Sequence, residues 1–261
     1  MVATPSGPVD DTAYAPAVTA ARLSIQIGVV CLVVAGALLS LPILYRQARA
    51  GKETIATRLQ QIGPRVEPIW RERMARAGIA VESPARFRVI LLAIKSERTL
   101  HVFTAPDSGP PVWLATFPIL AASGTAGPKL REGDRQVPEG LYAIESLNPN
   151  SRYHLALRVN YPSDEDRQQA KMDGRTDLGG DIMIHGGAGS VGCIALGDPA
   201  IEELFWLVAT AGHTRVECVI TPSRAPLADL TAKSPSWLSA RYDLLNQRTS
   251  ALLKIAPPQV R

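Results

Sequence analysis

The feature that most limits the possible folds of this chain of 261 residues is a series of short segments after Pro84 in which apolar and polar residues alternate. A period of two residues is typical of β-strands, and a polar triplet at residues 96–98 separates the first two segments as a hairpin turn would. Seven segments are predicted to form strands: residues 88–95, 99–105, 112–121, 140–147, 153–161, 181–185 and 215–221. The sequence therefore predicts a mostly β domain of the α+β class.

One helix is clearly indicated within this region. Asp198 is predicted as its N-cap and Pro199 as its first residue, and Gly212 is predicted to end it. Two long polar loops, residues 123–140 and 162–180, connect predicted strands. Long loops on a β scaffold commonly carry binding and catalytic residues, so we expect a site to draw on them.

Residues 24–45 form a stretch of 22 residues without a charge. This is about the length that a helix needs to cross the hydrocarbon core of a bilayer. A core helix of a soluble protein would show polar residues at every third or fourth position instead. We therefore expect a membrane anchor or an uncleaved signal-anchor here.

The rest of the chain is organised around this apolar segment. Pro64 and Pro68 interrupt the helical pattern that follows it, which predicts short linker helices closed by Gly78. The predicted order is a disordered leader (1–23), the anchor (24–45), a helical linker (46–84), a catalytic domain (85–224) and a C-terminal helical tail (225–261).

Positive charge follows the apolar segment more than it precedes it. Only Arg22 lies shortly before the segment, and the basic residues shortly after it are Arg46, Arg49, Lys52, Arg58 and Arg65. Taken alone, the positive-inside rule would place the C-terminal domain in the cytoplasm.

Composition excludes several classes of protein. The net charge is only +4, the basic residues are scattered and there are four phenylalanines, so we expect no nucleic-acid partner. Three cysteines without a Cys-x-x-Cys pair are too few for a disulfide framework and do not suggest a zinc site. Cys31 lies in the apolar segment and Cys218 in a predicted strand, so both are expected to be small buried residues. Cys193 is then the cysteine that could carry chemistry.

Cys193 follows His185 by eight residues, and four glycines lie between them. A cysteine becomes a nucleophile when a base favours its thiolate, and the oxyanion formed on the substrate carbonyl then needs hydrogen-bond donors. The glycines allow the backbone to fold back and bring the thiol within hydrogen-bonding distance of the imidazole. A tight turn that merely contains a buried histidine and cysteine would also fit, and the spacing alone does not decide.

Three stretches together resemble the L,D-transpeptidase catalytic-domain family, in the branch with a short spacing between histidine and cysteine. They are "IMIHGGAGSVGCIALGD", "SGTAGPKLREGDRQVPEGLYAI" and "LNPNSRYHLAL", and the similarity runs from about residue 87 to 222. The resemblance implies a β-sandwich-like domain that uses no metal and no organic cofactor.

The resemblance also implies roles for individual residues. Cys193 would be the acyl-forming nucleophile and His185 its general base, oriented by the backbone carbonyl of Gly186. The backbone amides of Gly192 and Cys193 would form the oxyanion hole, and Ser190 would fill a small position of the motif.

Two positions depart from the family pattern. Val191 stands where many members carry a second histidine, and Ala195 stands where many carry an arginine. The first change makes one wall of the site apolar, and the second removes a contact to a substrate carboxylate.

His154 and Arg152 are candidates for the substrate pocket. His154 alternates with Tyr153, Leu155 and Leu157, so it is expected on the face of its strand opposite that apolar set. A histidine held in the framework is the alternative, because periodicity does not show whether this face lines a cleft.

The implied reaction is an acyl transfer on peptidoglycan during cell wall remodelling. Cys193 would attack the carbonyl of the third residue of a stem tetrapeptide, release D-alanine, and pass the acyl group to an amine of a neighbouring stem as a 3-3 cross-link. The same thioester could pass to water instead, which would trim stems or release a wall-linked lipoprotein. A non-catalytic wall-binding module tethered to the membrane is an alternative from another class.

This function and the charge bias disagree about orientation, because peptidoglycan lies outside the inner membrane. We give the location of the substrate more weight, since the positive-inside rule is a tendency. We therefore expect an inner-membrane protein, anchored through residues 24–45, with its catalytic domain in the periplasm. Cleavage of a signal near residues 48–50 is the alternative.

Overall fold

The computed structural model describes residues 52–79, 87–106, 109–224 and 235–256. All the elements described below belong to one compact unit, residues 53–261. The expected leader and membrane segment, residues 1–45, lie outside the described residues, as does Cys31. Within the described ranges, no helix combines the length and the apolar character that a membrane crossing requires.

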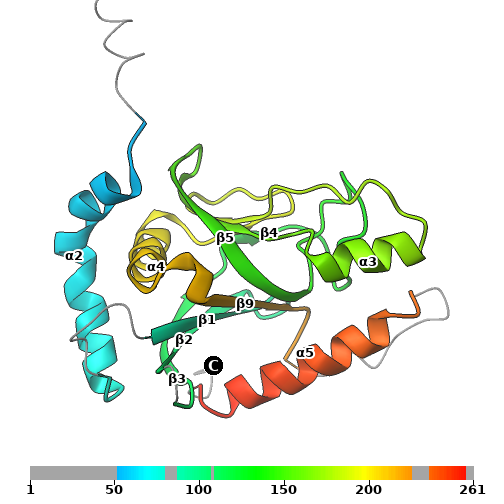
Figure 1. The fold of residues 1–261 in the computed structure, drawn as a ribbon. Helices are drawn as coiled ribbons and strands as arrows, with labels where there is room; N and C mark the ends of the chain where they lie inside the picture. Colours follow the sequence, from blue (N-terminus) through cyan, green and yellow to red (C-terminus); the bar gives the residue numbers. More distant parts are fainter. Residues whose placement is uncertain (1–51, 80–86, 107–108, 225–234, 257–261) are drawn as a thin grey trace, which may run out of the picture. The chain divides into compact units, whose positions relative to one another are not determined.

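A nine-stranded sheet forms the centre of this unit (Figure 1). Its strands follow the order β3-β2-β1-β9-β5-β6-β7-β8-β4. The pairs β1–β9 and β7–β8 are parallel, and the other neighbours are antiparallel. The strands are β1 (Phe87–Ile94), β2 (Thr99–Pro106), β3 (Val112–Pro118), β4 (Ala121–Ala122), β5 (Gly140–Ser151), β6 (His154–Val159), β7 (Met183–His185), β8 (Ile194–Ala195) and β9 (Val216–Thr221).

Strand β5 joins the two halves of this sheet. Its first residues, Gly140 to Ala143, pair with β9, and from Ile144 onward it pairs with β6. Two register shifts interrupt the pairing with β6, and such irregularities bend a strand and increase its twist. The two halves therefore lie as separate layers in Figure 1. The predicted mostly β, α+β class is confirmed, and the layers come from one sheet that curls at β5.

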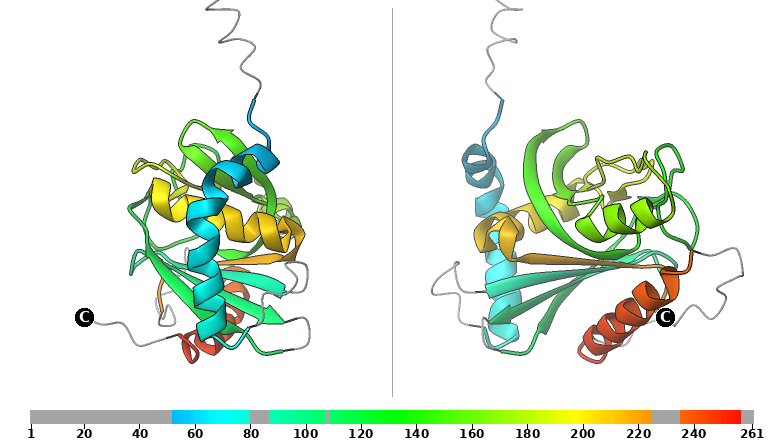
Figure 2. Two further views of the ribbon diagram at one scale, coloured as in Figure 1. Left: turned by 90° about the vertical axis from the view of Figure 1, so that its left-hand side faces the viewer. Right: turned by 45° about the vertical axis from the view of Figure 1, so that its right-hand side comes forward.

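The described helices lie around the sheet. They are α2 (Ile55–Arg76), α3 (Asp164–Met172), α4 (Asp198–Ala211), the 3-10 helix η3 (His213–Arg215) and α5 (Leu238–Leu253). Figure 1 shows α5 along the outer face of the layer that contains β1, β2 and β9, and Figure 2 shows α2 crossing α4.

Both faces of β1 are buried by these helices. Val89 and Leu91 belong to the apolar cluster that also contains buried residues of α2 and α4, whereas Ile90 and Leu92 belong to a second cluster with residues of α5. A strand that is buried on both faces reads as a continuous apolar run, as the sequence of β1 does. Each of the seven predicted strands is present. The predicted strand 112–121 is divided into β3, which ends at Pro118, and β4, which begins at Ala121, and the two-residue strand β8 was not predicted.

Helix α2 is continuous, so the prediction that Pro64 and Pro68 interrupt it was wrong. Both prolines lie on the exposed face of the helix, where water can satisfy the carbonyl groups that lose their intrahelical donors. The opposite face carries Val66, Trp70 and Met74, which are buried in the main core. Burial of this apolar stripe outweighs the cost of the two prolines.

Two further helix predictions were wrong. Residues 164–172 form α3 and not a loop, because Ser163 and Asp166 form a capping box at its start. Helix α4 begins at Asp198 with Gly197 as its N-cap, so Asp198 is the first residue of the helix and not its cap. The predicted end of α4 at Gly212 is confirmed.

Candidate active site

The register of β7 and β8 determines how His185 and Cys193 lie. These parallel strands pair Ile184 with Ile194 and His185 with Ala195. Cys193 directly precedes β8, so this register continues with Cys193 beside Met183, two residues before the histidine on the same face of the strand. The spacings of a β-sheet place two such Cα atoms about 8 Å apart. The two side chains therefore lie on the same face of the sheet.

His185 is nearly completely buried, with 2% of its surface exposed. Its Nδ1 atom lies 2.6 Å from the carbonyl oxygen of Gly186. A carbonyl only accepts hydrogen bonds, so Nδ1 carries the proton and Nε2 keeps its lone pair. Burial lowers the pKa of His185, and the Gly186 carbonyl opposes this shift only in part. The imidazole is therefore neutral at neutral pH and can act as a base through Nε2.

The residue after His185 must be a glycine for reasons of space. A Cβ atom on Gly186 would lie 2.6 Å from the Asp198 carboxylate and 2.6 Å from the carbonyl oxygen of Tyr153. The Asp198 carboxylate is held there because it accepts a hydrogen bond of 2.8 Å from the amide of Gly187. The start of α4 thus fixes the backbone whose carbonyl orients the imidazole.

Cys193 is partly exposed, and its thiol donates to the carbonyl oxygen of Asp181 at 3.5 Å. Burial raises the pKa of the Cys193 thiol, and a hydrogen bond from the backbone of Met183 opposes that shift. The resting pair is therefore a neutral thiol and a neutral imidazole. A base must remove the thiol proton as the sulfur attacks.

Two serine hydroxyls bind the turn that precedes the cysteine. The Cys193 amide donates to Ser190 Oγ at 3.1 Å, and this hydroxyl donates to the Cys193 carbonyl at 2.5 Å. The Gly192 amide donates to Ser123 Oγ at 2.6 Å, and Ser123 in turn donates to the carbonyl of Arg135 at 2.7 Å. Both amides predicted to form the oxyanion hole are thus bound to serine hydroxyls in this structure.

Ser123 was not among the predicted site residues. It directly follows β4, which pairs antiparallel with β8 and places Ala122 beside Ile194. The same register continues with Ser123 beside Cys193. Only the pairing of these two-residue strands brings it there, and strands this short leave almost no pattern in the sequence.

The loop that begins at Ser123 is fixed by a fully buried carboxylate. Glu139 accepts hydrogen bonds from Lys95 Nζ at 2.8 Å, from the amide of Gly127 at 2.9 Å and from the hydroxyl of Tyr242 at 2.6 Å. Tyr242 belongs to α5, so the C-terminal helix contacts the same loop that binds the turn before Cys193.

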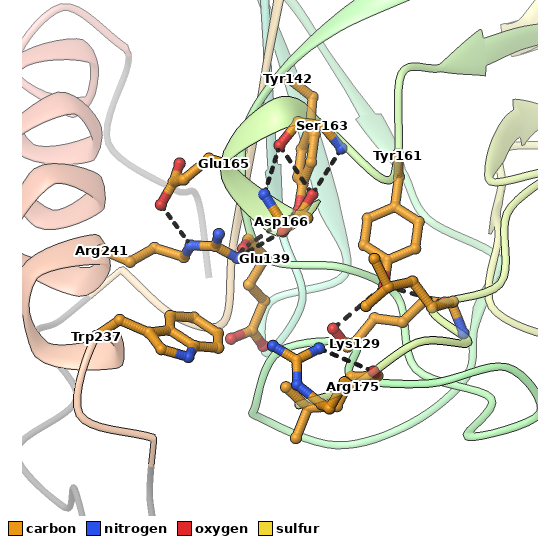
Figure 3. A network of polar contacts seen from close by, with 12 residues as sticks. Lys129, Glu139, Tyr142, Tyr161, Ser163, Glu165, Asp166, Arg175, Trp237 and Arg241 are labelled. Carbon is orange, nitrogen blue, oxygen red and sulfur yellow. Dashed lines mark hydrogen bonds and ion pairs between the residues drawn. The ribbon is translucent and has the colours of Figure 1, made fainter. Parts of the chain in front are cut away.

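Figure 3 shows how α5 is joined to its neighbours around this carboxylate. Arg241 bonds to Asp166 at 2.8 Å and to Glu165 at 2.9 Å, and both acids belong to α3. Arg241 and Asp166 are buried, and the guanidinium also lies 4.5 Å from the ring of Trp237. The buried contacts of α5 therefore reach both α3 and the loop at Glu139.

Of the two predicted pocket residues, Arg152 lies in the turn between β5 and β6, and His154 is the first residue of β6. His154 Nε2 lies 2.8 Å from a carboxylate oxygen of Glu202 on α4, which is a contact within the framework. Arg152 is exposed. Tyr153 lies between them and stacks on the His185 ring, with ring centroids 4.5 Å apart. The alternation of the predicted strand placed Tyr153 on the apolar face. Tyr153 stacks on His185 instead, because the positive φ of 72° at His154 breaks the alternation at the start of β6.

The two departures from the family pattern have different surroundings. Val191 is 73% exposed within the turn that precedes Cys193, whereas Ala195 is completely buried within β8. Among the described residues, no three histidine, cysteine or acidic side chains are grouped so that they could hold a metal ion.

Comparison with known proteins identifies this arrangement. Residues 88–218 match the family model of the L,D-transpeptidase catalytic domain. The chain is 33% identical over 147 residues to the Escherichia coli protein YafK, which is named an L,D-transpeptidase only provisionally. The alignment covers 54% of this chain and 57% of YafK, so the chain spans little more than half the length of this relative.

Solved structures of lower similarity include the helical cell shape determining protein Pgp2 from Campylobacter jejuni, at 23% identity and a TM-score of 0.43, with 72% of this chain and 68% of Pgp2 covered. Another is L,D-transpeptidase 1 from Mycobacterium tuberculosis, at 18% identity and a TM-score of 0.30, with 52% and 62% covered. Because the family model matches half of its length, including His185 and Cys193, this chain belongs to the L,D-transpeptidase catalytic-domain family.

Proposed function

We propose that this protein is a peptidoglycan L,D-transpeptidase that forms a thioester at Cys193 and transfers the acyl group between stem peptides. The observation that carries the proposal is the parallel register of β7 and β8, which presents His185 and Cys193 on one face of the sheet. The neutral state of both groups also supports the proposal. A neutral imidazole can accept the thiol proton without a third, charged residue beside the pair. The hydrogen bond from Nδ1 to Gly186 takes the place of an orienting acid.

In the first step, Nε2 of His185 accepts the thiol proton while Sγ of Cys193 attacks the carbonyl of the third residue of a stem tetrapeptide. The tetrahedral intermediate collapses as the bond between carbon and nitrogen breaks. D-alanine leaves with the proton that His185 returns to its nitrogen. For the Gly192 amide to stabilise the oxyanion, the Ser123 hydroxyl that now accepts its hydrogen bond must turn away.

In the second step, an amine of a neighbouring stem attacks the thioester and gives its proton to His185. The carbon–sulfur bond breaks, a 3-3 cross-link forms, and Cys193 regains its proton. Water in place of the amine would yield hydrolysis with the same residues in the same roles. The apolar Val191 at the rim and the absence of an arginine at position 195 bear on which acceptor enters.

Incubation of the full chain with purified muropeptides, followed by mass spectrometry, tests the proposal. New 3-3 dimers are the expected products. Trimmed stems, or lipoprotein released from intact sacculi, would assign hydrolysis instead. If Cys193→Ala leaves the products unchanged, the enzymatic proposal is wrong and a non-catalytic wall-binding module takes its place.

We also propose that residues 24–45 anchor the protein in the inner membrane with the catalytic domain in the periplasm. The uncharged length of this segment and the location of peptidoglycan support this orientation, whereas the basic residues after it oppose it. A reporter that is active only in the periplasm, fused to the C-terminus, should be active. An inactive periplasmic reporter together with an active cytoplasmic one would reverse the orientation.

A further inference from the structure

We infer that Tyr153 is a positioning residue for this reaction, whose ring covers the His185 imidazole and keeps water from it. The inference rests on the proposed function in one respect, namely that His185 is the base for Cys193. It adds a residue that neither the motif around the cysteine nor the strand pattern indicates.

The geometry of the two rings carries the inference. Their centroids are 4.5 Å apart and their planes are inclined by only 27°, so the tyrosine ring lies over the face of the imidazole. Tyr153 is 49% exposed, whereas His185 is 2% exposed. The tyrosine ring therefore lies between the imidazole and the solvent. About half of Tyr153 stays exposed to water, while its ring covers His185.

The turn between β5 and β6 holds Tyr153 in this position. Its amide donates to Ser151 Oγ at 3.1 Å, and its carbonyl oxygen lies against Gly186. The next residue, His154, has a φ of 72°, a conformation that is costly for a residue with a side chain. The bond between His154 and Glu202 on α4 stabilises this conformation, so α4 fixes the turn that presents the tyrosine.

Few charges face the imidazole, so the tyrosine cover acts mainly by excluding water. In the sheet His185 lies between Ala156 and Ala195, neither of which titrates. The titratable and charged groups on the elements packed around it are Arg152 and Tyr153 from the β5–β6 turn, His154 and Arg158 from β6, Asp181 before β7, Cys193 before β8, and Asp198, Glu202 and Glu203 from α4. Arg158 is paired with Asp181, and Glu203 is paired with Arg73. The Asp198 carboxylate is bound to the Gly187 amide and Glu202 to His154, so neither is bonded to the ring of His185.

Burial is the main reason that the pKa of His185 is below its ordinary value of 6.5. Removal of the tyrosine ring would expose the imidazole to water and stabilise its protonated form. The pKa of His185 would then rise, and a larger fraction of the base would be protonated and inactive at a slightly acidic pH.

An NMR titration of the histidine rings in the full chain tests this without any substrate. The chain has four histidines, and the signal of His185 is assigned by its loss in His185→Gln. In Tyr153→Ala the midpoint of His185 should move upward by roughly half a pH unit or more, toward the value of a free imidazole. Tyr153→Phe keeps the ring and should titrate like the natural protein.

The pH dependence of Cys193 alkylation by iodoacetamide gives a second readout, since it reports whether the base can accept the thiol proton. Its acidic limb should move upward in Tyr153→Ala and stay in place in Tyr153→Phe. Unchanged midpoints in Tyr153→Ala, with folding verified by circular dichroism, would overturn the inference. If the midpoints move but the muropeptides are untouched, the role of Tyr153 stands and the proposed substrate is wrong.

Discussion

At the scale of single residues, the proposed catalytic pair depends on a backbone position, Gly186, that has no room for a side chain. The Gly186 carbonyl orients the imidazole, and Asp198 and Tyr153 approach Gly186 so closely that a methyl group cannot fit. The reactive geometry is thus set by contacts of a glycine with α4 and with the β5–β6 turn. The tight fit leads to a specific prediction.

Gly186→Ala should lower the rate of thioester formation by about 100-fold or more, because a shift of about 1 Å in a catalytic group has that effect. Gly189→Ala is the matched control, since a Cβ atom there meets nothing within 4 Å. Single-turnover acylation with a tetrapeptide donor measures both. Equal rates for the two variants would show that the Gly186 carbonyl does not orient the base.

At the scale of elements, α2 is part of the catalytic domain and not merely a linker before it. Its apolar stripe joins the main core, the indole nitrogen of Trp70 donates to the Glu203 carbonyl of α4 at 2.7 Å, and Arg73 bonds to the Glu203 carboxylate. Arg65 contacts Glu202, the same residue that holds His154. Helix α2 therefore supports the helix whose first residue, Asp198, binds the Gly187 amide next to His185.

Trp70→Ala should lower the free energy of unfolding by about 3–5 kcal/mol, because it empties a fully buried site in the core. Arg71→Ala, one residue along on the exposed face, removes only a surface pair with Glu67 and should cost less than about 1 kcal/mol. Urea denaturation measures both. A small effect of Trp70→Ala would mean that α2 is dispensable and that the domain begins closer to residue 85.

At the scale of the whole molecule, the loop of residues 123–140 depends on a helix that lies outside the matched family region. Helix α5 follows residue 218, the end of that match, and it covers the outer face of β1 and β9. Its Tyr242 reaches Glu139, and its Arg241 reaches α3. The C-terminal helix therefore completes the core and supports the loop that binds the Gly192 amide through Ser123.

Arg241→Met should lower the free energy of unfolding by about 3–5 kcal/mol, since it leaves the buried carboxylate of Asp166 without its charged partner. Arg248→Ala, also on α5, breaks a partly exposed pair with Glu217 and should cost about 1 kcal/mol or less. Thermal and urea unfolding compare the two. If Arg241→Met is no less stable than Arg248→Ala, α5 is not held by this buried pair.

The sequence by itself determined the longer strands, the class of the fold and the histidine–cysteine motif. Alternating and continuous apolar runs follow directly from the burial of one or both faces of a strand, so local pattern sufficed for β1, β5 and β9. The prediction of a break at Pro64 and Pro68 was wrong because local propensity does not include the packing of α2 on the core.

Only the tertiary structure decided which residues meet at the site. Ser123, Tyr153 and the C-terminal Tyr242 come from segments far from Cys193 in the chain, and they are brought together by strand pairing, by the strained turn at His154 and by a buried carboxylate. Such contacts carry no periodic signal, because they depend on the register between distant elements. The sequence therefore named the reactive pair, and the fold decided what surrounds it and what keeps its base neutral.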